Sequence, residues 1–177
     1  MLEGLRFIRR DGLVLSLMVI VAITNMLDTP TGTVLLPVYA NRQLESATAL
    51  GVMMGAHGAG ATLGTIVFGA IGHLLPRRAT FIGAFIFVGL RYWILALLPS
   101  LAVTTGVLMI SGMAAGPINP ILLTIFQERT PAALRGRVFS ILMAMAMIAS
   151  PLGILLSGYI VEAIGLGTIL RTPRRLA

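Results

Sequence analysis

The sequence predicts an all-α fold, a multi-pass transmembrane helical bundle of about five spans. Of its 177 residues, 57% are hydrophobic and only 11% are charged. A soluble domain needs a polar shell, and 13 basic and 6 acidic side chains are too few to cover one. The apolar residues also gather in long continuous runs, whereas barrel strands need only about 10 alternating residues. This composition argues against a soluble enzyme.

Five apolar runs are long enough to cross a membrane, because a span needs roughly 20 residues for about 30 Å of hydrocarbon. They cover residues 12–40, 49–75, 79–98, 101–126 and 138–161. The polar breaks between them are short, which favours antiparallel neighbours in one bundle over residues 12–164. We expect residues 1–11 to form a cytoplasmic linker and residues 165–177 an atypical polar tail.

The basic residues set the orientation, and all of them are arginines. Cytoplasmic loops are enriched in Lys and Arg. One set of alternate segments holds most of the arginines, namely Arg6, Arg9, Arg10, Arg77, Arg78, Arg129, Arg135 and Arg137. The opposite loops hold only Arg42. We therefore expect a cell (inner or plasma) membrane protein with a cytoplasmic N-terminus. Five spans would place the basic tail outside, against this rule, so we expect a segment to be missing at that end.

Several classes of chemistry lack the residues that they need. Without cysteine there is no disulfide, thiol nucleophile or Cys-ligated metal. His57 and His73 are too isolated for a metal site, and no His-Glu-x-x-His, phosphate-loop or Gly-x-Ser-x-Gly motif occurs. The arginines lie between apolar runs, not on one nucleic-acid-binding face. We predict no enzyme activity, no metal, no cofactor and no nucleic-acid partner.

Asp28 is the first candidate for a functional residue. It lies well inside the first run, with Asn25 three residues before it on the same helical face. A carboxylate in lipid is costly unless it faces a cavity or a partner, so Asp28 could handle substrate or protons. The alternative is that Asp28 caps a helix that breaks at Pro30 and bonds only its own backbone.

Arg91 is the second charged residue inside a run. Tyr92 and Trp93 follow it, which favours anchoring at the outer interface. The alternative is a buried pairing role, and a pair with Asp28 is conceivable.

Two polar candidates remain in the second and fourth runs. Asn119 lies between Pro117 and Pro120, where the missing backbone donors favour either a pathway lining or a kink sealed by packing. For His57, we favour a hydrogen-bonded contact with another helix over a cavity lining or a titrating group. The pairs Gly51/Gly55 and Gly60/Gly64 around it predict close helix packing. Met143, Met145 and Met147 suit an adaptable surface but more simply fill gaps in a bundle.

Four segments carry a resemblance to a known family. Residues 127–140 (QERTPAALRGRVFS) are the strongest, and residues 3–11 (EGLRFIRRD), residues 35–40 (LLPVYA) and the set Pro151, Gly153 and Gly158 accompany them in order. Together they resemble the C-terminal half of a major facilitator superfamily transporter, in the efflux-type branch. The first segment is similar to that family's loop between helices ten and eleven. We interpret its charged residues first as cytoplasmic anchors that set the orientation, and the resemblance also implies gating roles for Glu128, Arg135, Gly136 and Arg137.

Residues 69–78 (GAIGHLLPRR) resemble a degenerate copy of a loop motif of the same family. Gly69, Arg77 and Arg78 match the motif, and His73 stands where the family has Asp. In the family this loop latches neighbouring cytoplasmic helix ends through charge pairs, so the loss of the carboxylate weakens the expected latch.

The resemblance implies a secondary transporter that exports small, drug-like or amphipathic molecules by alternating access, with proton exchange as a candidate driving force. Its partners would be the lipid bilayer, a small-molecule substrate and an N-terminal half, because such folds place the substrate between two repeats. The alternative is a truncated remnant without transport activity, or a membrane scaffold that packs against another subunit.

Overall fold

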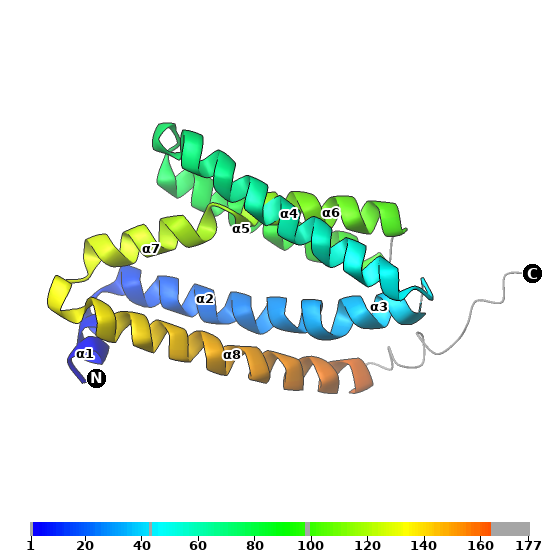
Figure 1. Cartoon of the computed structure of the whole chain (residues 1–177). Coiled ribbons are helices and arrows are strands. Elements are labelled where there is room, and N and C mark those ends of the chain that lie inside the picture. The colour runs from blue at the N-terminus through cyan, green and yellow to red at the C-terminus, as the bar shows by residue number, and fades with distance from the viewer. Residues whose placement is uncertain (1, 43, 98–99, 164–177) are drawn as a thin grey trace, which may run out of the picture. The chain divides into compact units, whose positions relative to one another are not determined.

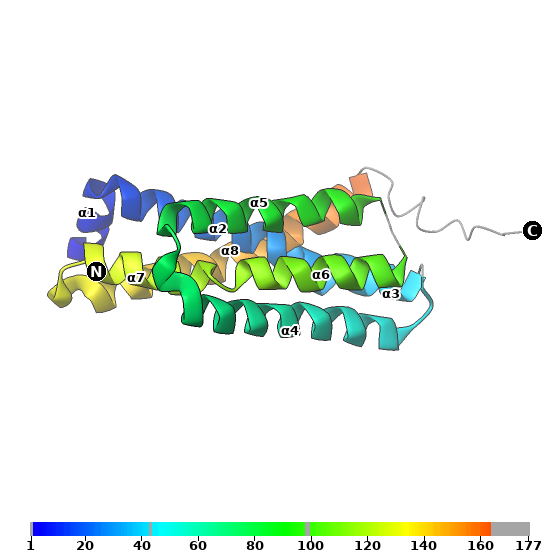
Figure 2. The same cartoon turned by 90° about the horizontal axis from the view of Figure 1, so that it is seen from above.

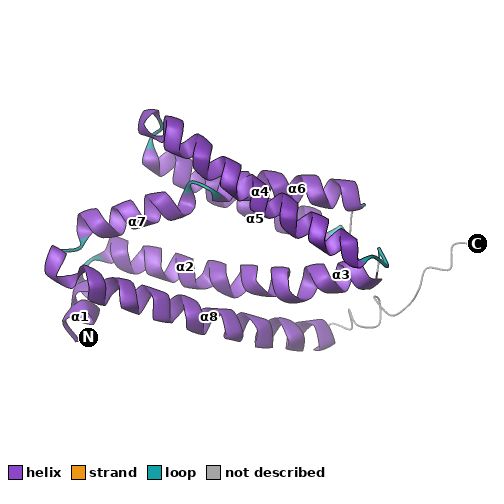
Figure 3. Cartoon of the chain, viewed as in Figure 1, coloured by secondary structure: helices purple, strands orange, loops and turns teal. Residues whose placement is uncertain are grey.

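A computed structural model describes residues 2–42, 44–97 and 100–163. These residues form helices joined by short loops and contain no strand (Figure 3), so the all-α prediction is confirmed. The elements in chain order are α1 (Leu2–Arg10), α2 (Gly12–Pro30), the π-helix η1 (Thr31–Leu35), α3 (Leu36–Arg42), α4 (Ala47–Ile71), the 3₁₀ turn η2 (Gly72–Leu74), α5 (Arg77–Ala96), α6 (Leu101–Ala115), α7 (Ile118–Arg129), the 3₁₀ turn η3 (Ala132–Leu134) and α8 (Arg135–Ala163) (Figure 1).

Five helical stretches are long and apolar enough to cross a membrane, by length and composition alone, as the sequence predicts. They are Gly12–Asn41, Ala47–Leu74, Arg77–Ala96, Leu101–Arg129 and Ala132–Tyr159. Their bounds differ from the predicted runs by a few residues, because polar caps and loop residues continue the helices beyond the apolar stretch. The predicted tail over residues 165–177 lies outside the described residues.

Large apolar side chains cover the outside of these helices. Trp93 is 78% exposed, Leu97 80% and Leu155 71%, and many other Leu, Ile and Phe side chains are exposed along the spans. Apolar patches of this extent are costly in water and favourable in hydrocarbon. The exposed surface therefore suits lipid as the surrounding medium.

The chain divides into two compact units, residues 1–45 with 129–177 and residues 46–128. In the first unit, α2 and α8 run side by side, and α1 packs against one end of both (Figure 1). In the second unit, α6 lies between α4 and α5 (Figure 2). The two units are considered separately below.

The α2–α8 contact forms where α2 contains a proline. Pro30 has no N–H, so the carbonyl of Met26 loses its helical donor. The helix does not break there, because the chain continues as the π-helix η1. Gly153 of α8 lies against the Met26 carbonyl so closely that a Cβ would overlap it. Beside this contact, the Thr29 hydroxyl donates to Ser150 Oγ at 3.0 Å.

Glycines also bring α4 and α6 together in the second unit. A Cβ at Gly60 or Gly64 would overlap the backbone oxygen of Met109 or Met113, and one at Gly112 would overlap that of His57. Gly60/Gly64 is therefore a packing pair, as predicted. Within the described part of the second unit, Gly51 and Gly55 make no such contact, because no atom lies within 4 Å of a Cβ at either position.

Candidate functional site

Arg91 occupies the polar centre of the second unit. It lies on α5 and is only 6% exposed, and its guanidinium donates to Ser111 Oγ of α6 at 3.4 Å and to the Tyr92 hydroxyl at 3.0 Å. The guanidinium carbon also lies 4.8 Å from the Tyr92 ring centroid, a cation–π contact. Ser111 is ten residues into α6, about 15 Å from the start of that helix and near the middle of a span.

This position corrects the interpretation of Arg91 as an interfacial anchor. The side chain turns inward and does not snorkel, and its guanidinium donates to hydroxyls on α5 and α6 inside the unit. Trp93, two residues on, points outward instead. The buried alternative describes Arg91 correctly.

His57 lies on α4 of the same unit. Its Nδ1 is 3.1 Å from the backbone oxygen of Leu108 on α6. A carbonyl only accepts hydrogen bonds, so this contact requires the proton on Nδ1. Near this contact, Gly60 of α4 and Gly112 of α6 let the backbones of the two helices approach closely. His57 therefore joins α4 to α6, in agreement with the hydrogen-bonded contact that the sequence favours.

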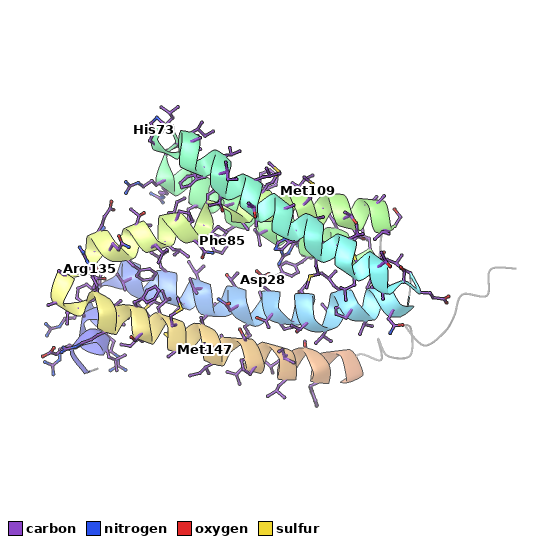
Figure 4. The ribbon with its side chains drawn as sticks, in the orientation of Figure 1. Asp28, His73, Phe85, Met109, Arg135 and Met147 are labelled. Atoms are coloured by element: carbon purple, nitrogen blue, oxygen red, sulfur yellow. The ribbon has the colours of Figure 1, made fainter. Side chains whose placement is uncertain are left out.

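Asp28 lies in the first unit, near the middle of the span Gly12–Asn41 (Figure 4). Asn25 is three residues before it on the same span. Both are half-buried. Asn25 donates to the backbone oxygen of Val21 at 2.9 Å, so its amide bonds its own helix. Asp28 is not followed by a helix break, which contradicts the alternative in which it caps one. In sequence, Asp28 is followed directly by Thr29, whose hydroxyl bonds Ser150, and the π-helix η1 begins three residues after it.

Asn119 is the second residue of α7, which follows the break at Pro117. Its side chain is exposed and bonds no neighbouring helix within the described residues. The break itself is packed: Pro120 cannot donate to the Gly116 carbonyl, and the Thr65 hydroxyl of α4 lies 3.3 Å from that oxygen.

The loop residues Arg77 and Glu128 form an ion pair within the second unit. Arg77 Nη1 donates to Glu128 Oε1 at 2.8 Å and to Oε2 at 3.0 Å, joining the start of α5 to the end of α7. The two side chains are 58% and 55% exposed, so the pair contributes little to stability. Arg78 is exposed, and Gly69 has open space where a Cβ would lie. Glu128 thus supplies Arg77 with a carboxylate although His73 replaces the motif's Asp.

The other loop candidates lie in the first unit, at the start of α8. Arg137 donates to Glu3 of α1, and Arg135 Nε donates to the Thr130 carbonyl at 3.2 Å. A Cβ added at Gly4 of α1 would lie 3.2 Å from the Arg137 Cβ, whereas one added at Gly136 would meet no described atom within 4 Å. Residues 1–11, expected as a linker, therefore include a helix fixed to α8.

Sequence reasoning missed the residues that complete these contacts, namely Ser111, Thr29, Ser150, Gly112 and Glu3. Two signals could have found some of them. Thr104 and Ser111 are seven residues apart and share a face of α6, and both are buried. Thr29-Pro30 and Ser150-Pro151 are the same hydroxyl–proline pattern on two helices.

Apolar helices of spanning length with buried polar groups partway along them define a multi-pass membrane protein. The chain belongs to the Major Facilitator Superfamily, whose family profile matches residues 15–172.

Three relatives share the name multidrug efflux pump Tap. The chain is 34% identical to the protein from Mycolicibacterium fortuitum over 93% of its own length and 40% of the relative's. It is 33% identical to those from Mycobacterium bovis (strain BCG / Pasteur 1173P2) and Mycobacterium tuberculosis (strain ATCC 25618 / H37Rv), over 93% of its length and 39% of theirs. The chain thus spans about two fifths of these relatives. No solved structure matches significantly.

Proposed function

We propose that the chain is part of an efflux transporter that moves small, amphipathic molecules across the cell membrane. The similarity to proteins named multidrug efflux pumps supports this direction and substrate class. Arg6, Arg9 and Arg10 at the start of the chain support a cytoplasmic N-terminus by the positive-inside rule. The proposal needs no catalytic residue, because transport changes no covalent bond.

One observation carries the proposal: ionisable side chains lie partway along apolar helices. Arg91 is buried among hydroxyls, and Asp28 lies three residues before the π-helix of a proline-containing span. Charged groups inside a membrane are costly and commonly mark substrate or ion pathways. π-Helices inside longer helices are also frequent at functional sites. We assign Asp28 and Arg91 to the transport pathway, with Asn25, His57 and Asn119 as secondary candidates.

The test is efflux of a fluorescent amphipathic cation from cells without their own major pumps. The chain is expressed alone and together with the N-terminal half of the Mycolicibacterium fortuitum relative. We expect dye efflux in at least one condition, and we expect Asp28→Asn to reduce the rate about tenfold or more. If proton exchange drives the process, an uncoupler will abolish it.

Glu45→Gln is the matched control, because it removes the same charge from an exposed loop residue. It is expected to leave the rate unchanged when both variants reach the membrane in equal amounts. Absence of efflux in both conditions, or equal rates for Asp28→Asn and the unmodified chain, would overturn the proposal.

A further inference from the structure

An open hollow of about 480 Å³ lies in the first unit, where α1 meets α2. Its lining residues are Phe7, Arg10, Asp11, Gly12, Leu13 and Arg129. Arg10 ends α1, and Gly12 and Leu13 begin α2, so the hollow lies at the corner between the two helices. None of the pathway or loop candidates named above lines it.

The charge of the hollow is positive. Arg10 and Arg129 are both exposed, and neither forms an ion pair with a described residue. Asp11 is the acidic residue of the lining, and its Oδ1 accepts from the backbone N–H groups of Leu13 and Val14 at 3.1 Å each. Its carboxylate thus caps α2, and two guanidinium groups remain to bind an anion.

The position of the hollow suits a ligand that is anionic at one end and apolar at the other. Leu13 is 43% exposed and lies at the start of the first apolar span, where hydrocarbon would begin. Phe7 adds a second apolar side chain on the α1 side. The buried Ile8 and the ion pair of Glu3 with Arg137 hold α1 against the bundle. A ligand here meets guanidinium groups at headgroup depth and apolar side chains beside them.

We propose that this hollow binds the phosphate of an anionic phospholipid, with Arg10 and Arg129 as its ligands. Phe7 and Leu13 contact the glycerol and the first part of the acyl chains. Basic pockets beside spans on the cytoplasmic face are suited to such headgroups, and guanidinium groups bind phosphate through paired hydrogen bonds. The lipid would stabilise the corner between α1 and α2.

The test is native mass spectrometry of the full chain in detergent, titrated with dioleoylphosphatidylglycerol or dioleoylphosphatidylcholine. We expect the first phosphatidylglycerol to bind at least tenfold more tightly than phosphatidylcholine. The double variant Arg10→Gln/Arg129→Gln is expected to weaken phosphatidylglycerol binding by roughly 30-fold, because each arginine near an anionic surface contributes about fivefold.

Arg6→Gln/Arg9→Gln is the control, because it removes the same charge from exposed α1 positions outside the hollow. It is expected to change phosphatidylglycerol binding less than threefold. Equal losses of phosphatidylglycerol binding in the two double variants would show that the lipid responds only to the total positive charge, and would overturn the proposal. Full competition by excess inorganic phosphate, with no preference between the lipids, would instead identify a site for soluble anions and also overturn it.

A second measurement uses the unmodified chain and so does not depend on how a variant folds. A photoactivatable phosphatidylglycerol, with its reactive group near the headgroup, is expected to crosslink to residues 7–13. Crosslinks that avoid this segment would contradict the site.

Discussion

At the scale of single residues, hydroxyl groups are the partners that make polar side chains acceptable inside apolar helices. Ser111 accepts from the guanidinium of Arg91, and Thr29 donates to Ser150. Inside hydrocarbon no water replaces a lost partner, so each of these bonds should be measurable.

Ser111→Ala is expected to lower the free energy of unfolding by about 1 kcal/mol, because it removes an acceptor from a buried charged group. Denaturation by sodium dodecyl sulfate in mixed micelles, followed by circular dichroism, measures this loss. Ser157→Ala is the control, because among the described residues the Ser157 hydroxyl bonds only the Ile154 carbonyl of its own helix. An equal effect of the two substitutions would show that the Arg91–Ser111 bond contributes nothing.

The position of Arg91 within a span is readable from the sequence, whereas its direction is not. Tyr92 and Trp93 beside it are typical of an interface. Their directions differ, however, because Trp93 is exposed and the Tyr92 hydroxyl turns back to the guanidinium. The partner that decides this, Ser111, is 20 residues away on another helix. Side-chain direction here is therefore a property of the packed unit.

At the scale of helices, glycines lie against the carbonyls to which prolines cannot donate. Pro117 cannot bond the Met113 carbonyl, which accepts from the Gly116 N–H at 3.3 Å, and Gly64 lies against that oxygen. Pro30 likewise cannot donate to the Met26 carbonyl, and Gly153 lies against that oxygen. A Cα–H group of glycine can contact such an oxygen at close range, a weak hydrogen bond that partly replaces the lost one. This arrangement lets prolines occur inside spans without breaking them.

Gly64→Ala is expected to destabilise the second unit by about 1–3 kcal/mol, because its Cβ would overlap the backbone of α6. The thermal unfolding midpoint in detergent measures the effect. Gly55→Ala, on the same helix but in open space, is expected to be neutral or slightly stabilising. Equal destabilisation by both substitutions would mean that Gly64 does not meet α6.

The charge pair between Arg77 at the start of α5 and Glu128 at the end of α7 gives a prediction about activity. Because the pair is exposed, Glu128→Gln is expected to change the free energy of unfolding by less than about 1 kcal/mol. If the pair controls opening at the cytoplasmic end, the same substitution will alter the efflux rate several-fold. The charge reversal Arg77→Glu/Glu128→Arg should then restore most of that rate. Failure of the reversal to restore it would argue against a role of the pair itself.

The number of spans and the all-α class follow from the sequence because lipid demands long apolar helices. The packing faces do not follow from it. Gly51/Gly55 and Gly60/Gly64 have the same spacing, yet only the second pair meets a neighbour. The helix break considered at Pro30 is likewise absent, because the π-helix and Gly153 on α8 accommodate the proline. Such outcomes depend on contacts between distant segments.

At the scale of the whole molecule, the proposed account is a multi-pass bundle with its arginine-rich helix ends in the cytoplasm. Arg77 and Arg78 begin the third span, Arg129 ends the fourth, and Arg135 and Arg137 lie near the start of the fifth. The positive-inside rule supports a cytoplasmic position for these ends. The absence of cysteine makes this arrangement directly measurable, because any introduced thiol is the only one in the chain.

The most direct test of this account is labelling of single-cysteine variants in intact cells with a membrane-impermeant maleimide. Alternating spans predict that Ala47→Cys and Ser100→Cys lie on one side of the membrane, and that Ala79→Cys and Ala133→Cys lie on the other. All four positions are exposed. We expect the first two to react in intact cells and the second two to react only after permeabilisation. Reaction of all four in intact cells, or the reverse pattern, would contradict the spans and their orientation.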